Sequence, residues 1–288
     1  MDWAPEFYSR TGAWWGPAEA RITDRDLRRV ELIERFAGGS DADADAGTDA
    51  SARARKVLEL GCGYGTTAAT AARAGHQVTA VELSDRVGFA AQFEAEFEAG
   101  SEAGGGAGSL TVVRGDFYAV DPGGQFDVVC YWNGFGIGSD ADQRRLLRRI
   151  STEWLTADGV ALVDIANPFV WASWDGDDEI RHARPDAGYA YSLHERTSFD
   201  PVSNRAVDTW WEVDDPGNAI SQTIRCYTPA DLLLLLEGTG LELASVIVGD
   251  TSVSPSQPWA GFGTLLREAH EYLAVLAPSE IMKSPMGS

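Results

Sequence analysis

A glycine-rich turn after a short apolar run is the first feature of the chain with the residue types for ligand binding. The run contains Glu59, and glycines then alternate at Gly61, Gly63 and Gly65, with Cys62 between the first two. Alternate glycines let a ligand approach the backbone, and N–H groups at the start of a following helix face that ligand. The turn therefore predicts a ligand-binding site at the end of a strand.

Two acidic residues farther along could hold other parts of the same ligand. Glu82 and Leu83 stand at the end of a second apolar run, where a carboxylate can accept both hydroxyls of a ribose. A solvent-facing residue at a strand end is the competing interpretation of Glu82. Asp116 and Phe117 follow a third run and offer a carboxylate to an adenine amino group and an aromatic face to its ring.

Strand-like and helix-like patterns alternate around these residues. The apolar runs are rich in valine and bounded by Gly or Asp, which is typical of buried parallel strands. They lie at 56–60, 77–81, 126–131 and 160–165, with helical patterns at 66–74, 85–98 and 140–154. Strands that alternate with helices imply right-handed crossovers, so we expect an α/β fold with a doubly wound sheet.

The pattern changes after Asn167-Pro168. Three stretches then alternate polar and apolar residues between turns, at 189–199, 206–213 and 219–227. This periodicity predicts an antiparallel meander inserted into the α/β chain. Helix periodicity resumes at Thr228, which forms a capping box with Asp231. Two more strands are expected at 241–248 and 272–276.

These patterns divide the chain into five parts. They are a helical lid segment and acidic linker at 1–55, a ligand-binding core at 56–166, an antiparallel substrate cap at 167–227, the C-terminal completion of the core at 228–281 and a tail at 282–288.

The spacing of these motifs resembles that of a known family. Glu59-x-Gly61-x-Gly63-x-Gly65, Glu82, Asp116-Phe117 and Phe126-Asp127-Val128-Val129 occur in the order found in class I S-adenosylmethionine-dependent methyltransferases. The resemblance implies a Rossmann-like, seven-stranded sheet and S-adenosylmethionine as cofactor, with S-adenosylhomocysteine as product. It assigns the methionine part to the glycine turn, the ribose to Glu82 and the adenine to Asp116 with Phe117.

The inserted cap resembles that of small-molecule methyltransferases, including amino-sugar N-methyltransferases, where the insertion covers the substrate. The resemblance implies an acceptor from specialised metabolism. The segment from Trp132 to Gly136 stands where this family meets its acceptor, and Trp132 is expected at the cofactor. The segment holds no N/D-P-P-Y/F motif, and the chain has no recognisable triad of metal ligands, so an oxygen, nitrogen or carbon acceptor stays open. The expected substrate pocket comprises Tyr8, Trp14, Trp15, Asn133, Phe135, Asn167 and Trp171.

Several aromatic residues in this set have two interpretations. Tyr8, Trp14 and Trp15 could shield a sulfonium by cation–π attraction, or they could anchor the first helix to the sheet. Trp171 could line an aromatic acceptor pocket or pack within the cap. Of the neighbours Trp210 and Trp211, only one can face a given cavity, because adjacent residues on a strand point to opposite faces.

Two histidines in the inserted region are candidates for a base. A base is needed only if the nucleophile of the acceptor arrives protonated. His182 and His194 could take that proton, since histidine titrates near neutral pH. An exposed or packing histidine is the competing interpretation of each.

Composition limits the partners. The chain has 23 Lys and Arg against 44 Asp and Glu, a formal charge of -21, which disfavours nucleic acid and anionic membranes. No apolar run approaches the roughly 20 residues that span a bilayer, and the N-terminus lacks the apolar core of a signal peptide. The three cysteines are widely spaced and suggest reduced thiols in a cytoplasm and no metal site. An edge of the cap sheet could pair with a second subunit to form a homodimer.

Two other functions fit parts of the pattern. An NAD-dependent oxidoreductase uses a related glycine turn, but Thr66 stands where its last glycine belongs, and Glu59 and Asp116-Phe117 fit it poorly. A catalytically silent protein could keep the cofactor site as a regulator or accessory subunit.

Overall fold

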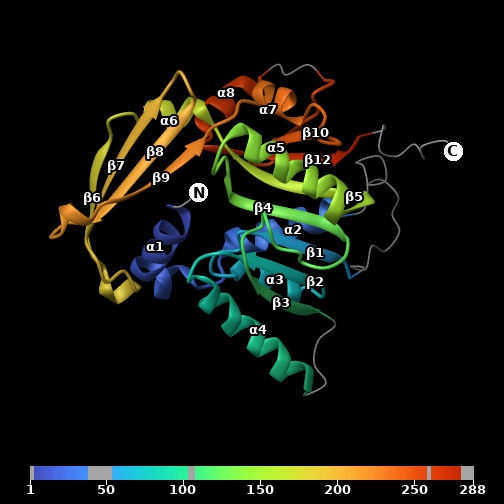
Figure 1. Ribbon diagram of the computed structural model, residues 1–288, viewed down its shortest axis with the longest axis horizontal. Helices are drawn as coiled ribbons and strands as arrows, with labels where there is room; N and C mark the ends of the chain where they lie inside the picture. The colour runs from blue at the N-terminus through green and yellow to red at the C-terminus, as the bar shows by residue number, and fades with distance from the viewer. Residues whose placement is uncertain (1–2, 38–53, 103–107, 258–260, 280–288) are drawn as a thin grey trace.

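The structure is a computed structural model that describes residues 3–37, 54–102, 108–257 and 261–279 (Figure 1). Its α-helices are α1 (Ala4–Glu19), α2 (Asp24–Phe36), α3 (Thr66–Arg73), α4 (Val87–Glu102), α5 (Asp140–Arg149), α6 (Pro168–Ser173), α7 (Pro229–Leu236) and α8 (Phe262–Glu268). A π-helical turn, Ile150–Trp154, extends α5, and short 3₁₀ turns lie at Pro185–Ala187 and Pro216–Asn218.

A mostly parallel sheet forms the centre of the protein. Its order is β11-β10-β12-β5-β4-β1-β2-β3. The strands are β1 (Lys56–Leu60), β2 (Gln77–Glu82), β3 (Ser109–Arg114), β4 (Phe126–Phe135), β5 (Leu155–Ala166), β10 (Leu241–Val248), β11 (Thr251–Val253) and β12 (Glu271–Pro278). The five neighbouring strands β3, β2, β1, β4 and β5 are parallel to one another. The pairings of β5 with β12, of β12 with β10 and of β10 with β11 are antiparallel. The predicted doubly wound α/β fold is confirmed.

Helices cover both faces of this sheet, and successive side chains on a strand point to opposite faces, so one strand can contribute to two apolar clusters. Along β1, Leu58 and Leu60 join the apolar cluster covered by α5, α7 and α8. Val57 joins the cluster covered by α2, α3 and α4. Burial on both faces explains why these strands read as continuous apolar runs.

A second, antiparallel sheet forms the cap. It contains β6 (Asp178–Arg181), β7 (Leu193–Asp200), β8 (Arg205–Glu212) and β9 (Ile220–Arg225), in that order. The meander of three strands agrees with the prediction, and β6 is an addition. All four residues of β6 are exposed, so its sequence carries no polar–apolar alternation. The helix α1 packs against the inner face of the cap through an apolar cluster that includes Phe7, Trp210 and Ile220 (Figure 1).

The central sheet has eight strands where the family resemblance implies seven. The additional strand, β11, is a three-residue hairpin partner of β10 across the turn Gly249-Asp250. Gly249 takes a positive φ of 58°, which glycine adopts without strain. Three residues are too few to show a period of two, so the sequence pattern misses this strand.

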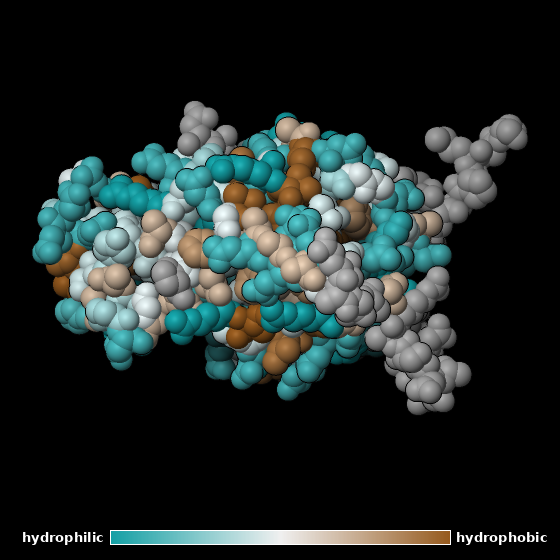
Figure 2. Space-filling view, turned by 90° about the horizontal axis from the view of Figure 1, so that it is seen from below, coloured by the Kyte–Doolittle hydropathy of each residue, from teal (hydrophilic) through white to brown (hydrophobic). Residues whose placement is uncertain are grey.

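The space-filling view in Figure 2 shows a face on which hydrophobic areas are separated by hydrophilic residues. None of the helices in the described ranges combines the length and the apolarity needed to cross a bilayer. Most of the acidic linker, half of the glycine-rich segment 100–109 and the tail 282–288 lie outside the described residues.

Candidate functional site

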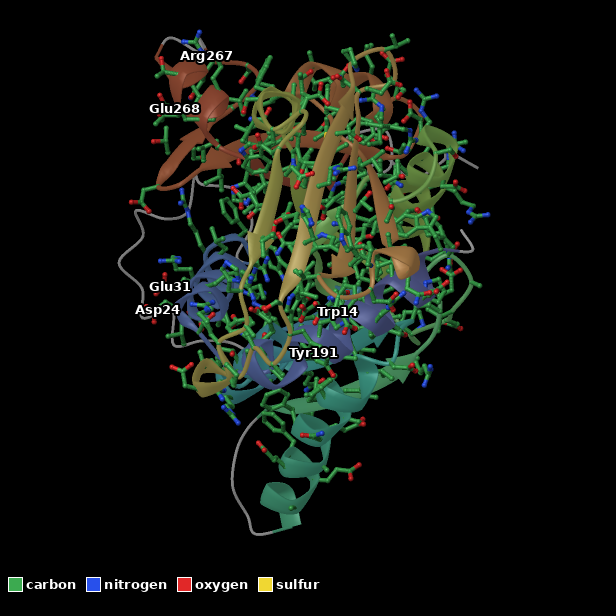
Figure 3. The ribbon with its side chains drawn as sticks, turned by 90° about the vertical axis from the view of Figure 1, so that its left-hand side faces the viewer. Trp14, Asp24, Glu31, Tyr191, Arg267 and Glu268 are labelled. Atoms are coloured by element: carbon green, nitrogen blue, oxygen red, sulfur yellow. The ribbon has the colours of Figure 1, made fainter. Side chains whose placement is uncertain are left out.

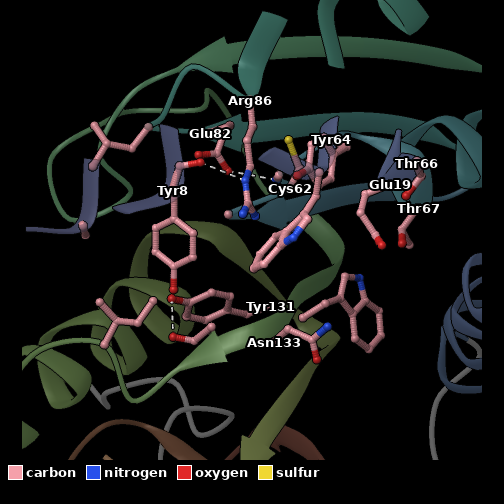
Figure 4. Close-up of a pocket in the computed structure, with 18 of the residues that line it drawn as sticks. Tyr8, Glu19, Cys62, Tyr64, Thr66, Thr67, Glu82, Arg86, Tyr131 and Asn133 are labelled. Carbon is pink, nitrogen blue, oxygen red and sulfur yellow. Dashed lines mark hydrogen bonds between the residues drawn. The ribbon is translucent and has the colours of Figure 1, made fainter. Parts of the chain in front are cut away.

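A cavity of about 850 Å³ lies among the carboxyl ends of the central strands, α1 and the cap (Figure 4). Ligand pockets usually measure about 300–1,000 Å³, so this cavity is of the size of a small-molecule site. Parallel strands place their carboxyl ends at one edge of a sheet, where open α/β sheets bind ligands. The cavity therefore lies where the predicted motifs converge.

The glycine turn adopts the conformation that its glycines allow. The φ angles of Gly61, Gly63 and Gly65 are 61°, 56° and 78°, in the left-handed region that favours glycine. Gly61, Cys62 and Gly63 line the cavity. Gly65 does not, and a Cβ there would lie 2.6 Å from the Cβ of Ala90. Gly65 thus allows α3 to pack closely against α4.

The second and third strand ends bring two more predicted groups to the cavity. Glu82 is buried and accepts hydrogen bonds from the Gly63 backbone N–H at 2.8 Å and the Ser84 backbone N–H at 2.8 Å. Leu83 lines the cavity beside it. The Glu82 carboxylate therefore joins the end of β2 to the glycine turn.

Asp116 and Phe117 line the same cavity after β3. The Asp116 carboxylate accepts the Tyr118 backbone N–H at 2.8 Å. The Phe117 ring packs edge-on against Tyr131, with 5.2 Å between the ring centroids. The loop after β3 thereby presents a carboxylate and an aromatic face together, as the sequence predicts.

Glu59 lines the cavity from near the carboxyl end of β1. Burial raises the pKa of its carboxyl to about 8, against the opposing charge of Arg29. No hydrogen-bond donor contacts this carboxyl among the residues that the structure describes. The Glu59 carboxyl is therefore protonated at neutral pH in the ligand-free cavity, and a cation bound beside it would favour its ionised form.

A charged network surrounds Trp132 and Asn133 at the end of β4. Arg29 of α2 lies over the Trp132 ring at 4.9 Å and pairs with Asp164 at 3.1 Å. Burial, followed by the neighbouring charge of Glu271, raises the pKa of Asp164 above its usual value. With its amide nitrogen turned toward Glu271, Asn133 donates to that carboxylate at 2.6 Å and accepts from Arg29 at 3.2 Å. Asn133 and Trp132 both line the cavity.

Asp26 connects α2 to the start of α3. Its carboxylate accepts the hydroxyls of Thr66 at 2.8 Å and Thr67 at 2.7 Å, and it completes a capping box with Thr23. Burial disfavours the charged form, but these hydrogen bonds outweigh burial and hold the pKa of Asp26 below its usual value. Thr66 and Thr67 line the cavity, so Asp26 holds part of its wall in place.

The helix α1 closes one side of the cavity. Tyr8 and Trp15 line it, and the Tyr8 hydroxyl donates to Gln222 of the cap at 3.1 Å. Arg86 donates to the Tyr8 carbonyl at 3.0 Å and fixes α1 to the core (Figure 4). Trp14 points elsewhere: it is buried beneath the cap strands and donates to Glu212 at 2.9 Å (Figure 3).

Three other expected pocket residues lie outside the cavity lining. Asn167 is buried and donates to the carbonyl of Ala269 at 2.7 Å, which ties the start of α6 to the end of α8. Phe135 is in the apolar core. Trp171 packs edge-on against Trp174, with 5.2 Å between the centroids.

The two candidate bases are separated by the cap sheet. His182 lines the cavity just after β6. His194 is not among the lining residues; it hydrogen-bonds Asp178 and stacks at 4.2 Å on Trp211. Trp210, the neighbour of Trp211, lines the cavity instead. The register of the cap strands decides which face each side chain takes.

Sequence reasoning missed many lining residues, most of them on α1, α2 or the cap. They include Glu19, Arg25, Arg29, Tyr64, Thr67, Arg86, Tyr118, Tyr131, Arg145, Arg181, Arg184, Tyr189 and Tyr191. Thr67 was within reach of sequence reasoning, because it follows the glycine turn. For arginines on a helix and in a loop, no local pattern distinguishes a cavity wall from a solvated surface.

Comparison with known proteins adds an independent observation. A family model described as a methyltransferase domain matches residues 22–246. A search of curated proteins finds no match.

Several solved structures have a similar fold. The CcbJ methyltransferase from Streptomyces caelestis has a TM-score of 0.62 and 19% identity, over 90% of this chain and 92% of that one. An S-adenosylmethionine-dependent methyltransferase from Clostridium acetobutylicum has a TM-score of 0.58 and 14% identity, over 78% and 84%. CalS10, an amino pentose methyltransferase from Micromonospora echinaspora, has a TM-score of 0.52 and 17% identity, over 89% and 91%. At these identities the likeness concerns the fold.

Proposed function

Because the chain belongs to the methyltransferase domain family, we propose that it transfers a methyl group from S-adenosylmethionine to a small-molecule acceptor. One observation carries the proposal. The left-handed glycine turn opens onto the same cavity as Glu59, Glu82 and Asp116, which come from three neighbouring strands. These groups match the cofactor's ammonium, ribose hydroxyls and adenine amino group in number and type.

The residues on the cavity wall suit each part of the cofactor. Glu59 would hold the ammonium group, and Gly61 and Gly63 would let the backbone approach the methionine part. Glu82 would accept the ribose hydroxyls in addition to its backbone donors, because a carboxylate has about four acceptor sites. Asp116 and Phe117 would hold the adenine.

The orphaned polar atoms support this fit. The Trp132 indole N–H and the Tyr64 hydroxyl are buried and have no hydrogen-bond partner among the described residues. Both residues line the cavity, and buried polar groups are normally satisfied. A polar ligand would supply the missing partners.

The protein's part in the reaction is orientation and exclusion of water. When bound, S-adenosylmethionine supplies a methyl group attached to a positively charged sulfur. Trp15 and Tyr131 line the cavity, and the face of an aromatic ring attracts a positive charge. The α1 helix and the cap cover the cavity, which limits water and fixes the approach of the acceptor. If the nucleophile arrives protonated, a ring nitrogen of His182 would take the proton.

The acceptor side of the proposal rests on the cap. The similarity to CcbJ and to an amino pentose methyltransferase supports a small acceptor, and specialised metabolism is part of the proposal. The methylated atom, oxygen, nitrogen or carbon, is assigned by mass spectrometry of the product. We further propose a cytoplasmic protein without nucleic-acid or membrane partners. Pairing of two copies along the cap edge is tested by the mass of the protein in solution.

Calorimetric titration with S-adenosylmethionine, S-adenosylhomocysteine and NADH tests the cofactor. We expect saturable binding of the two sulfur ligands and none of NADH. Glu82→Ala should weaken binding, because each lost hydrogen bond to a charged acceptor is worth about 1.5–3 kcal/mol. Glu96→Ala, on the exposed side of α4, is the matched control. Absence of binding by folded protein would refute the proposal, and binding without turnover of any acceptor would favour a silent cofactor-binding protein.

A further inference from the structure

The cap side of the cavity is lined by cations, although the formal charge of the whole chain is -21. Arg181 is the last residue of β6 and Arg184 follows it closely in the chain, while Arg25 lines the same cavity from α2. In a chain with so many acidic residues, arginines on one side of a cavity indicate that this side binds an anionic group, rather than that they serve solubility.

One of these cations is already neutralised by the protein. Arg181 donates to Glu195 at 2.6 Å and lies over the Trp210 ring at 5.0 Å. Its charge is therefore balanced by Glu195 within the cap sheet, so Arg181 is a weak candidate for binding an anionic ligand.

Arg184 has a different environment. Its guanidinium stacks on the Tyr189 ring at 4.7 Å, and it forms no ion pair with any residue in the described ranges. The backbones of the two residues also bond in both directions, at 2.7 and 3.0 Å. Stacking leaves the N–H edge of a guanidinium available for a ligand.

The loop that carries Arg184 is held in place. The Tyr189 hydroxyl donates to Glu19 of α1 at 2.8 Å. Gly188, with a φ of 92°, packs so closely on Ala18 that an added Cβ would lie 3.3 Å from it. Because Gly188 and Tyr189 are docked on α1 and Arg184 stacks on Tyr189, Arg184 is oriented before any ligand arrives, and less entropy is lost on binding.

We propose that the acceptor carries an anionic oxygen group, a carboxylate or a phosphate, and that Arg184 binds it. The inference rests on the proposed function and names the acceptor class for the same cavity. The planar guanidinium matches both anions through two parallel hydrogen bonds. Arg25 of α2 adds a further positive charge to the cavity lining.

An acceptor whose only charge is an ammonium group is disfavoured at this wall. Glu19 lines the cavity but already accepts the Tyr189 hydroxyl. The acidic residues near the start of the cap lie outside the cavity lining; they are Asp175, Asp177, Asp178 and Glu179. Of these, Asp178 is paired with Arg196 at 2.6 Å. A cation at this wall would therefore be repelled by the charge of Arg184, and Glu19 is the nearby carboxylate that would have to offset that repulsion.

The test uses simple probes, because the acceptor is unidentified. Protein saturated with S-adenosylhomocysteine is titrated by calorimetry with benzoate, with the neutral analogue benzamide and with inorganic phosphate. Arg184→Gln is compared with Arg196→Gln, which removes the same charge from the outer face of the same sheet. Circular dichroism and S-adenosylhomocysteine binding verify that both variants fold.

We expect benzoate or phosphate to bind in the millimolar range and benzamide not to bind. Loss of the bidentate pair in Arg184→Gln should weaken anion binding about tenfold or more, and Arg196→Gln should leave it unchanged. Preference for benzoate or for phosphate identifies the anion. Equal binding of benzamide, equal loss in both variants, or no anion binding would overturn the inference. If S-adenosylhomocysteine itself fails to bind, the proposed function fails, and the same anion titrations on the ligand-free protein still test Arg184.

Discussion

Replacement of Glu59 by Gln removes a proton-binding group from the cavity wall. Burial raises the pKa of the Glu59 carboxyl from 4.5 to about 8 in the ligand-free protein, so at pH 6–7.5 it holds a proton. Holding the cofactor's ammonium requires the carboxylate. Binding therefore releases this proton, and the affinity should rise with pH until the carboxyl ionises by itself.

The magnitude follows from linkage. If Glu59 has a pKa of about 8 when free and is ionised in the complex, the Kd of S-adenosylhomocysteine should fall about 25-fold between pH 6 and 7.5. The same group makes stability depend on pH. A raised carboxyl pKa means that the folded state holds a proton that the unfolded state has lost, so this group's contribution to stability decreases from about pH 4.5 to about pH 8.

Calorimetry measures both consequences. Titrations in two buffers of different ionisation enthalpy count the protons released, which should approach one for the wild type near pH 6.5 and none for Glu59→Gln. Glu59→Gln should also bind weakly and flatten the pH dependence of the melting temperature. Glu96→Gln, an exposed carboxylate on α4, is the control. A wild-type Kd that does not change between pH 6 and 7.5 would refute the role given to Glu59.

Three further outcomes are expected. Asp26→Asn should lower the free energy of unfolding at pH 7 by about 2–4 kcal/mol in urea titration, since hydrogen bonds to a charged acceptor are each worth about 1.5–3 kcal/mol. Because the pKa of Asp26 is lowered, this contribution should vanish toward acid pH, and a deficit that persists there would contradict the argument. Gly65→Ala should lower the melting temperature far more than Gly75→Ala, since both positions have positive φ but only the first meets a neighbour; equal losses would mean that backbone strain alone matters. If the acceptor is deprotonated on the enzyme, His182→Asn should lower kcat and remove the acidic limb of its pH profile, whereas His194→Asn should retain both; the reverse result would move the base to the outer cap face.

The residues at the cofactor end of the cavity could be predicted from the sequence. Its groups follow the carboxyl ends of buried parallel strands, and local patterns reveal such ends because valine-rich runs stop at a Gly or an acidic residue. The sequence predicts that Glu59, Glu82 and Asp116 lie at one edge of the sheet, and all three line one cavity. For these groups, the alternation of strands and helices carries enough information to place them together.

The acceptor end could not be predicted in this way. Trp14 and Trp15 are neighbours on α1, and a turn of about 100° per residue places only the second one at the cavity. Asn167 follows β5, as a substrate-binding residue would, but its side chain is used in joining α6 to α8. Local sequence records which residues are present and does not record which way a helix is rotated.

The sequence by itself determined the sheet, the glycine turn and the carboxylates that follow the strands, because these features depend on periodicity and on neighbours in the chain. The tertiary structure alone decided which arginines and aromatic rings reach the cavity. Arg29 meets Asp164, and the loop that carries Arg184 is docked on α1 by Tyr189 and Glu19, through contacts between segments distant in the sequence. Such contacts depend on how the cap and the first two helices pack on the sheet, and packing is set by the whole core rather than by any local pattern.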